Sequence, residues 1–516
     1  MPHTIKIYRE DKFIRETEGG PSDNLLSCIN AAGAHIDAPC GGQGRCEKCL
    51  VRLNPYGAQI LACRTAVDRD MDVYLPAEAE MEIVETGAVD SGASSHEPPL
   101  HEPPPNAKLG AAIDIGTTTV VVHLIDMNTG MRIATASGAN AQRAYGADVI
   151  SRIQYCVDNG HEDLTLLIRQ QLSELIRQTC VISGERSRDI KCISIAANTV
   201  MEHLAAGYPP NDMGVAPFTP VDLFGSELPA WEGLVAAKTA KVYYAPAISA
   251  YFGGDAIAGM YAAKLIEDEG PTIYLDIGTN GEMAMKYGDT YYCCSTAAGP
   301  AFEGAEITFG MAAVVGAINH VKWEDGLKTS VIRDEVPRGM CGSGLVDALA
   351  VMVSNGVVDE TGRLLDPEEI EGDIAEHVGK VDGKNVFWLT KRPDGVYMTA
   401  LDIRKLQLAK SAIAAGIQTL IRHVGITEDQ VKSFVLAGGF GSFMDQFSAS
   451  CIGMFPKSFL PKTITLGNTA GEGASLALYS GAARQALDEI RERCQYIELS
   501  ADPVFRDEFV EQMMFE

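Results

Sequence analysis

The chain has 516 residues, of which 46% are hydrophobic and 22% are charged, and its formal net charge is −27. This length accommodates about three domains of roughly 150 residues. So negative a chain is not expected to bind nucleic acid or an anionic membrane, because both attract clustered Lys and Arg.

The N-terminal sequence, MPHTIKIYRED, is charged where a signal peptide would be apolar, and no run of 18 apolar residues occurs. We therefore expect a cytoplasmic protein. In that compartment the 13 cysteines are expected to bind metal or to lie in the core rather than to form disulfides.

The first predicted elements are two short strands and a helix. TIKIYRE and KFIRETEGG alternate in polarity and are joined at Asp11, which predicts a strand pair. SDNLLSCINAAG predicts a helix that is capped within residues 22–24 and stopped at Gly33. Cys28 lies on the apolar stripe of this helix and is expected to be a core residue.

Four further cysteines follow with the spacing C-x5-C-x2-C-x13-C: Cys40, Cys46, Cys49 and Cys63. A zinc ribbon normally supplies two C-x2-C pairs, and only one pair is close here. Three neighbouring cysteines and a distant fourth are typical of plant-type [2Fe–2S] ferredoxins. Gly41, Gly42 and Gly44 would let such a loop wrap tightly.

Residues 3–84, including CGGQGRCEKC and LACRT, resemble a [2Fe–2S] ferredoxin domain. The first gap is five residues against four in the plant pattern, and Glu47 stands where many members have glycine. The resemblance implies that all four cysteines hold the cluster, with zinc as the alternative metal.

The next segment, residues 85–107, is rich in Pro, Gly, Ser and acidic residues and has almost no apolar ones. It predicts a flexible, partly polyproline linker. A cluster on such a tether could visit two docking sites, and the alternative is a passive spacer.

An internal duplication begins after the linker. GAAIDIGTTTVVVHLIDMNTGMRIATAS, from residue 110, has a counterpart in TIYLDIGTNGEMAMKYGDTYYCCSTAAG, from residue 272. Each of these stretches predicts three strands, the first of which ends in Asp-Ile-Gly-Thr. Two such repeats are expected to form two lobes that face each other across a cleft. Gly116 and Gly278 allow tight turns that present N–H groups to phosphate, and Asp114 and Asp276 could hold water on Mg²⁺.

A third glycine-rich element is SFVLAGGFGSFMDQF, from residue 433, which predicts a buried strand, a turn and a helix start beside a nucleoside or phosphate. Two stretches of small residues, 244–263 and 467–478, suit helices that pack closely at a hinge. The sequence contains neither a Walker A motif nor G-x-G-x-x-G, so P-loop and Rossmann folds are not indicated.

In this order, the elements resemble the ATPase superfamily of acetate and sugar kinases, heat-shock chaperones and actin. More narrowly, SIAANTVMEHLAAG, APFTPVDLFG, STAAGPAFEGAEITFGM, GMCGSGLVDALA and DIRKLQLAKSAIAAGI resemble the reductive activators of corrinoid proteins. These are ATP-dependent iron–sulfur proteins that return inactive Co(II) corrinoid to Co(I). The match spans nearly the whole chain, and the C-terminal tail has only Cys494, so a single cluster is expected.

The resemblance implies an α+β, β-grasp ferredoxin domain at 1–84, the linker, and a duplicated α/β actin-like ATPase fold with lobes at 108–208 and 209–516. It assigns the first phosphate loop to Asp114, Gly116, Thr117 and Thr118, the second to Asp276, Gly278, Thr279 and Asn280, and the adenosine site to Gly438, Gly439 and Phe440. It also implies ATP with Mg²⁺, a corrinoid protein partner, a low-potential electron donor and a homodimer.

Several other residues are candidates for the site. Asp255, Glu303 and Glu306 could position water or a magnesium ion. Cys293, Cys294 and Cys341 are expected to be buried. His203 is expected to be a satisfied helix residue, and the alternative is that its helix face docks a corrinoid.

The predicted function is ATP-dependent transfer of one electron from the cluster to a Co(II) corrinoid. The alternatives are an activator of another low-potential enzyme, a redox-sensing nucleotide-binding module and, last, a small-molecule kinase fused to a ferredoxin. Activators of dehydratases usually hold a [4Fe–4S] cluster between subunits, which the four N-terminal cysteines do not favour.

Overall fold

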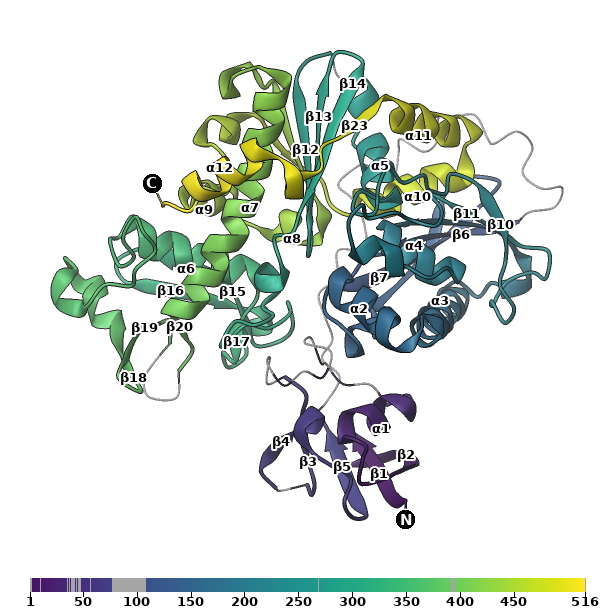
Figure 1. Cartoon of the computed structure of the whole chain (residues 1–516), viewed down its shortest axis with the longest axis horizontal. Helices are drawn as coiled ribbons and strands as arrows, with labels where there is room; N and C mark the ends of the chain where they lie inside the picture. The colour runs from purple at the N-terminus through teal and green to yellow at the C-terminus, as the bar shows by residue number, and fades with distance from the viewer. Residues whose placement is uncertain are drawn as a thin grey trace.

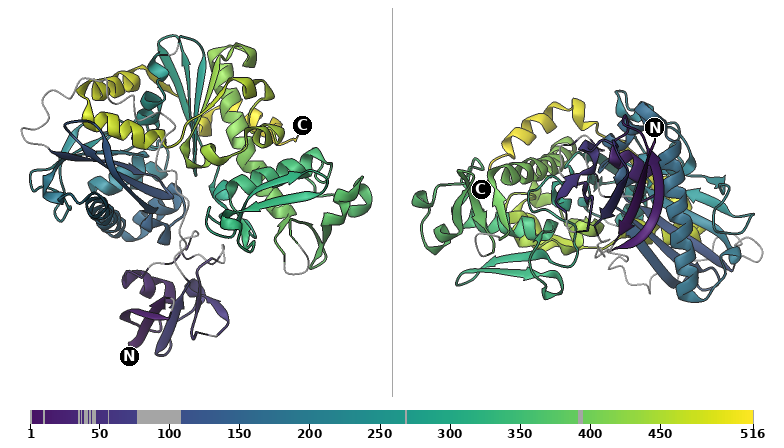
Figure 2. Two further views of the ribbon diagram at one scale, coloured as in Figure 1. Left: turned by 180° about the vertical axis from the view of Figure 1, so that it is seen from behind. Right: turned by 90° about the horizontal axis from the view of Figure 1, so that it is seen from below.

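The computed structural model describes residues 2–9, 11–34, 36, 38, 42, 44, 48–55, 57–76, 108–267, 269–390 and 395–515. Residues 2–76 form an N-terminal domain, and the remaining described residues form two lobes, each built on a six-stranded sheet (Figure 1). The N-terminal domain lies at the side where the two lobes meet, as the views from behind and from below also show (Figure 2). The predicted linker, 85–107, lies outside the described residues.

The N-terminal domain is a five-stranded sheet with one helix against it. Its elements are β1 (His3–Arg9), β2 (Lys12–Gly19), α1 (Leu25–Ala31), β3 (Leu50–Arg52), β4 (Gln59–Leu61) and β5 (Met71–Leu75), with strand order β2-β1-β5-β3-β4. Asp11 has a φ of 61° at the predicted turn, and Asn24 caps α1 by accepting a hydrogen bond from the Ser27 amide. The strand pair and the helix are therefore confirmed. Cys28 is buried in this core, as expected.

The first lobe, residues 108–267, is built on a sheet with strand order β10-β11-β9-β6-β7-β8. Its elements are β6 (Leu109–Ile115), β7 (Thr119–Asp126), β8 (Arg132–Ala139), α2 (Val149–Asn159), α3 (Glu162–Ser183), β9 (Ile190–Ala197), α4 (Thr199–Ala206), β10 (Glu227–Pro229), β11 (Lys241–Tyr244) and α5 (Gly254–Ala262). The expected lobe boundary at residue 208 placed β10 and β11 in the second lobe. The structure instead pairs β11 in parallel with β9, because the chain crosses over through α4 before it returns to the same sheet.

The second lobe, residues 269–515, repeats this arrangement in a sheet with order β22-β21-β12-β13-β14-β23. The strands are β12 (Thr272–Ile277), β13 (Gly281–Tyr287), β14 (Thr290–Thr296), β21 (Ser433–Ala437), β22 (Thr463–Thr465) and β23 (Cys494–Tyr496). In both lobes an antiparallel meander carries two parallel strands at its first edge, β9 and β11 in one and β21 and β22 in the other. The predicted duplication is confirmed by this shared topology.

The second lobe also carries two three-stranded sheets and most of the remaining helices. These elements are β15 (Ala317–Trp323), β16 (Leu327–Val331), β17 (Gly339–Met340), α6 (Gly342–Ser354), β18 (Val378–Val381), β19 (Lys384–Trp388), β20 (Tyr397–Thr399), α7 (Ala400–Val424), α8 (Gly438–Phe443), α9 (Gln446–Cys451) and α12 (Pro503–Glu511). Two helices from the same part of the chain, α10 (Thr469–Tyr479) and α11 (Gly481–Arg493), pack instead against α5 of the first lobe, and α10 also packs on the sheet of that lobe. In the part of the chain that the structure describes, no helix combines the length and the apolar character needed to cross a membrane.

Helices α5 and α10 pack directly on each other between the two large sheets (Figure 1). A Cβ on Gly473 would lie 2.2 Å from the backbone oxygen of Ala258, and a Cβ on Gly259 would lie 2.1 Å from the Tyr274 hydroxyl. A larger residue would therefore require a shift of the backbone at Gly473 and of the Tyr274 side chain at Gly259. The prediction of close packing between these small-residue helices is therefore confirmed.

Candidate functional site: a nucleotide cleft between two lobes

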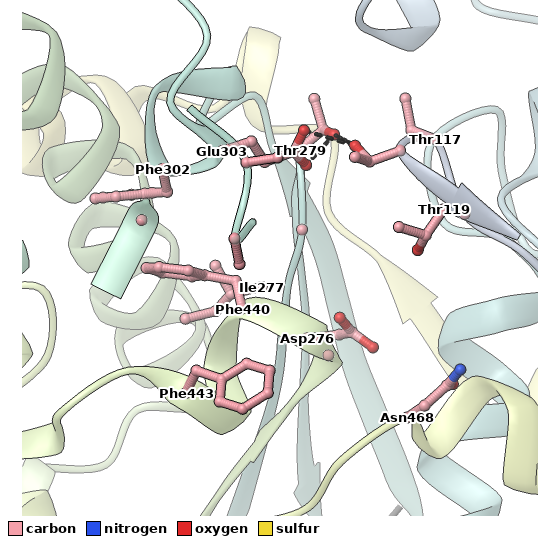
Figure 3. A pocket seen from close by; sticks show the side chains of 18 of the residues that line it. Thr117, Thr119, Asp276, Ile277, Thr279, Phe302, Glu303, Phe440, Phe443 and Asn468 are labelled. Atoms are coloured by element: carbon pink, nitrogen blue, oxygen red, sulfur yellow. Dashed lines mark hydrogen bonds between the residues drawn. The ribbon is translucent and has the colours of Figure 1, made fainter. Parts of the chain in front are cut away.

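A cleft of about 270 Å³ lies between the two lobes. It is lined by the turns after β6 and β12, by the segment that starts α8, and by the N-termini of α5 and α10. Figure 3 shows the two threonine-bearing turns facing each other, with Asp276 and Asn468 below them and the aromatic rings of Phe302 and Phe440 to one side. The structure thus brings the three predicted glycine-containing elements to one place.

The first turn is fixed from behind by polar side chains. A Cβ on Gly116 would lie 2.9 Å from the backbone oxygen of Thr119, so the turn requires glycine. Asn198 donates a hydrogen bond to the Thr117 hydroxyl at 3.1 Å. The buried guanidinium of Arg152 donates to the Thr117 backbone oxygen at 2.5 Å, and burial lowers its pKa to about 9. The side chain of Thr117 is therefore held in place, while that of Thr118 points into the cleft.

The second turn meets the first through a carboxylate. Glu303 accepts one hydrogen bond from the Thr118 hydroxyl at 2.5 Å and another from the Thr279 hydroxyl at 2.6 Å. Glu306, the other acidic candidate in this stretch, is half exposed and faces Lys405 instead. Of the two glutamates, the structure therefore brings only Glu303 to the phosphate loops.

Three aspartates converge on the floor of the cleft. Burial raises the pKa of Asp114 to about 7. A hydrogen bond from Asn468 at 2.7 Å lowers this pKa, and the negative charge of Asp276 raises it further. Burial also raises the pKa of Asp276 to about 6, against the effect of the Tyr274 hydroxyl. The pKa of Asp255 is raised by burial and by the other two aspartates, and burial raises that of Glu282 as well. A divalent cation would relieve this crowding of negative charge.

These acids predict an unusual dependence of stability on pH in the absence of metal. The pKa of Asp114 is about 7 against an ordinary value of 3.8, so the folded state binds its proton more tightly than the unfolded chain does. Protonated Asp114 therefore adds to the free energy of unfolding, on the order of a few kcal/mol. This contribution is fully present below pH 3.8 and is lost as the pH rises from there through about 7. We expect the melting temperature in chelator to fall over this range and Asp114→Asn to flatten the slope. Asp507→Asn, on the exposed surface, is the control, and an unchanged slope in Asp114→Asn would contradict the assignment.

The adenosine element follows β21. Gly438 has a φ of +85°, and a Cβ there would lie 2.3 Å from Oδ1 of Asp276. A Cβ on Gly439 would have no atom of the described residues within 4 Å. Phe440 stacks on Phe302 with ring centroids 5.2 Å apart, which gives this side of the cleft an apolar wall. The arrangement suits a planar base beside a backbone turn.

Gly438 and Gly441, both in α8, give a matched pair of variants. Gly438→Ala is expected to weaken ATP binding at least tenfold, because the new methyl group meets Asp276 and the backbone at +85° is strained for alanine. Gly441→Ala adds the same methyl group where the structure places no described atom within 4 Å and away from the residues that line the cleft, so it should leave the affinity within about twofold. Titration calorimetry with a non-hydrolysable ATP analogue measures both. Equal affinities in the two variants would show that Gly438 does not shape the site.

The sequence interpretation missed three residues that hold the site: Asn198, Asn468 and Arg152. Each asparagine caps a helix that follows a parallel strand: Asn198 caps α4 after β9, and Asn468 caps α10 after β22. The signal was present as Asn-Thr in SIAANTV and again in TLGNTAG. Arg152 carries no comparable signal, because only the tertiary fold places it behind Thr117.

Two of the four predicted cluster ligands, Cys49 and Cys63, are among the described residues. Cys40 and Cys46 lie outside the described residues. Cys49 is buried, and its backbone oxygen accepts a hydrogen bond at 2.9 Å from the amide of Ala62, the residue before Cys63. A Cβ on Gly42 would lie 3.9 Å from Cβ of Cys63, so the glycine loop approaches the same place. The segments that carry Cys49 and Cys63 therefore lie side by side, and the described residues alone contain no group of three or more metal-binding side chains.

The remaining candidates are core residues. Cys293, Cys294 and Cys341 are buried, as expected. His203 is fully buried. Its Nδ1 atom lies 2.7 Å from the backbone oxygen of Thr199, and its Nε2 atom accepts a hydrogen bond from the Val221 amide at 3.0 Å. The alternative that its face docks a corrinoid is therefore wrong, because Val221 and its neighbours cover the ring.

The fold and the site define an ATPase domain of the class of acetate and sugar kinases, heat-shock chaperones and actin. Residues 270–516 match a family model described as the C-terminal domain of RACo, the ASKHA domain, and residues 109–268 match the RACo middle region. The chain belongs to this family.

Two curated relatives and one solved structure extend the comparison. The corrinoid activation enzyme RamQ of Eubacterium limosum is 31% identical over 96% of this chain and 96% of that protein. The Co(II) methylated amine-specific corrinoid protein reductase of Methanosarcina barkeri is 26% identical, over 70% of this chain and 68% of that protein. A solved reductive activator for corrinoid, iron–sulfur protein has a TM-score of 0.71 and 28% identity, over 99% of this chain and 98% of that chain.

Proposed function

We propose that this protein is an ATP-dependent reductive activator that restores a corrinoid protein from Co(II) to Co(I) by delivering one electron. The N-terminal domain, as a β-grasp ferredoxin domain, would hold a [2Fe–2S] cluster on Cys40, Cys46, Cys49 and Cys63. The partners are a corrinoid protein and a low-potential electron donor, and we propose a cytoplasmic homodimer.

The observation that carries this proposal is the joining of two sites in one chain. The N-terminal domain, which carries the four predicted cluster ligands, makes hydrogen bonds to the rim of the nucleotide cleft. A small-molecule kinase would have no use for a redox domain at this position. The names of the two relatives and of the solved structure support a corrinoid protein as the electron acceptor.

Within the cleft we assign distinct roles to the chain's own residues. The hydroxyls of Thr118 and Thr279 would donate to phosphate oxygens from opposite lobes, and the backbone at Gly278 and Asn280 would line the same phosphates. The carboxylates of Asp114, Asp255 and Asp276 would hold Mg²⁺ through water, since they do not form a ligand cage by themselves.

The nucleoside would lie against Gly438, Gly439 and Phe440. In this assignment, the contacts from the two lobes hold one ligand, so ATP binding and hydrolysis would change the relative position of the lobes.

The energetic need for ATP follows from the redox couples. When bound, a plant-type [2Fe–2S] cluster supplies one electron at about −400 mV. A protein-bound Co(II)/Co(I) couple is generally harder to reduce, and for one electron each 59 mV of uphill transfer costs about 1.4 kcal/mol. A gap of one or two hundred millivolts therefore needs only a few kcal/mol. ATP binding and hydrolysis would supply it by changing the conformation or cobalt ligation of the corrinoid partner.

The experiment mixes the reduced protein under argon with a panel of Co(II) corrinoid proteins and records visible spectra with and without Mg·ATP. Growth of the Co(I) band only with ATP would support the proposal and identify a partner. No Co(I) band across the panel, with reduced protein and bound ATP both verified, would contradict it. Negligible ATP hydrolysis with every partner, together with no electron transfer, would point instead to a redox-sensing module.

A further inference from the structure

The N-terminal domain makes hydrogen bonds to both lobes. On the first lobe, the Asn30 side-chain amide donates to the backbone oxygen of Ala144 at 3.3 Å. On the second lobe, the Lys48 ammonium donates to the backbone oxygens of Gly310 at 3.1 Å and Ile307 at 3.5 Å. The domain therefore spans the edge at which the lobes meet (Figure 1).

The contact point on the first lobe is tied to the first phosphate loop. Asn140 donates through its side-chain amide to the backbone oxygen of Gly116 at 2.8 Å. The same asparagine caps the short 3₁₀ helix Ala141–Ala144, whose last residue is the acceptor for Asn30. Asn140, which contacts Gly116, is therefore only four positions before Ala144, which contacts the N-terminal domain.

The contact point on the second lobe is tied to the second phosphate loop in the same way. The segment 304–310, which we name the rim loop, begins directly after Glu303 and ends at the acceptor for Lys48. A Cβ on Gly310 would lie 2.1 Å from the backbone oxygen of Gly304, so the two ends of the rim loop touch. The side-chain carboxylate of Asp402 accepts from the Thr308 amide and hydroxyl at 2.9 and 3.1 Å, which fixes the loop to α7. The rim loop is therefore a rigid part of the second lobe.

Glu303 closes the cleft at the level of the phosphate loops. Its carboxylate uses the hydroxyls of Thr118 from the first lobe and Thr279 from the second. Nucleotide phosphates are anions that would take hydroxyl donors in the same turns, so the phosphates and the carboxylate compete for them and repel each other. Loss of the bond between Glu303 and Thr118 removes a direct link between the lobes and allows them to take a different relative position.

We infer that the N-terminal domain is docked across the two lobes through Asn30 and Lys48, and that nucleotide phosphates release the Lys48 contact by displacing Glu303. A rigid domain cannot keep both contacts when the lobes that carry them change their relative position. The contact with the first lobe persists because Asn30 is buried there, whereas Lys48 is only partly buried. Lys48 immediately precedes Cys49, so its release would uncover the proposed cluster for a partner. This inference rests on the proposed function, because it names the regulation of the same electron-transfer domain.

The test measures the reactivity of the Lys48 amine in the full chain. The protein is treated briefly with an acetylating N-hydroxysuccinimide ester, with and without Mg²⁺ and a non-hydrolysable ATP analogue, and mass spectrometry gives the rate at each lysine. Without nucleotide, Lys48 should react more slowly than Lys6 and Lys12, which are exposed on the same domain. The nucleotide should raise the Lys48 rate about tenfold, roughly the protection expected from a hydrogen bond of a charged donor, and leave the two controls unchanged.

A matched pair of variants tests whether Glu303 couples nucleotide binding to the release of Lys48. Glu303→Ala should raise the Lys48 rate without nucleotide to near the nucleotide-bound value, because the link to Thr118 is gone. Glu306→Ala removes a carboxylate three residues away that does not face the phosphate loops and should behave like the native chain. Equal rates in the two variants would overturn the route through Glu303.

Two further outcomes separate this inference from the proposed function. If calorimetry shows that the analogue binds but the Lys48 rate does not change, the inference is overturned while ATP-dependent Co(I) formation can still be observed. If the analogue does not bind at all, both are overturned. A Lys48 rate equal to that of Lys6 without nucleotide would show that the domain is not docked through Lys48 and would also overturn the inference.

Discussion

Asp276→Asn is expected to lower ATP-driven Co(I) formation at least a hundredfold while leaving the spectrum of the N-terminal cluster unchanged. Asp276 is the penultimate residue of β12 in the second repeat, is buried in the cleft, and lies beside the backbone of Gly438. An amide has nearly the same shape but no charge, so it cannot balance a magnesium ion, and loss of one such group at a phosphate site typically costs two to three orders of magnitude. Visible spectra of the corrinoid partner under argon measure the rate.

Asp289→Asn is the matched control, because Asp289 lies exposed in the turn between β13 and β14 of the same repeat. It should retain the native rate. If Asp276→Asn binds the nucleotide, stays folded and still drives Co(I) formation at the native rate, the second repeat does not contribute the catalytic carboxylate. A parallel loss of the cluster spectrum in Asp276→Asn would contradict the separation of the two sites.

Cys49→Ala is expected to abolish electron delivery and to preserve ATP binding. Its thiol is buried beside the segment that carries Cys63, and a cluster that needs four thiolates cannot be held by three and a methyl group. The absorbance and electron paramagnetic resonance signal of the cluster should be lost. Calorimetry should give an ATP affinity within about twofold of the native value, because the cleft is built entirely from residues of the two lobes.

Cys28→Ala provides the control within the same domain. Cys28 is buried in the N-terminal core but is not one of the four predicted ligands. The variant should keep the cluster signal even if its melting temperature falls by a few degrees, which is typical of a small change in core volume. Retention of the full signal in Cys49→Ala, or its loss in Cys28→Ala, would contradict the assignment of the ligands.

The repeats were the most predictable part of the fold. The two Asp-Ile-Gly-Thr segments predicted matching meanders, and β6–β8 and β12–β14 have that form. Strand alternation and a positive-φ turn are local properties, so short stretches of sequence suffice to indicate them. The lobe boundary was less predictable, because β10 and β11 return to the first sheet through pairings that no local pattern records.

Residue type and spacing along the chain were sufficient to predict the chemical groups of the two sites: four spaced thiols, two glycine turns that follow aspartates, and small-residue helices. Which of these groups meet follows from the tertiary structure. It placed Glu303 between Thr118 and Thr279, chose it over Glu306, and set Asn468 against Asp114 across 354 positions of the chain. It also brought Lys48 to the rim loop, because contacts between distant segments follow from how whole sheets and helices pack rather than from any local pattern.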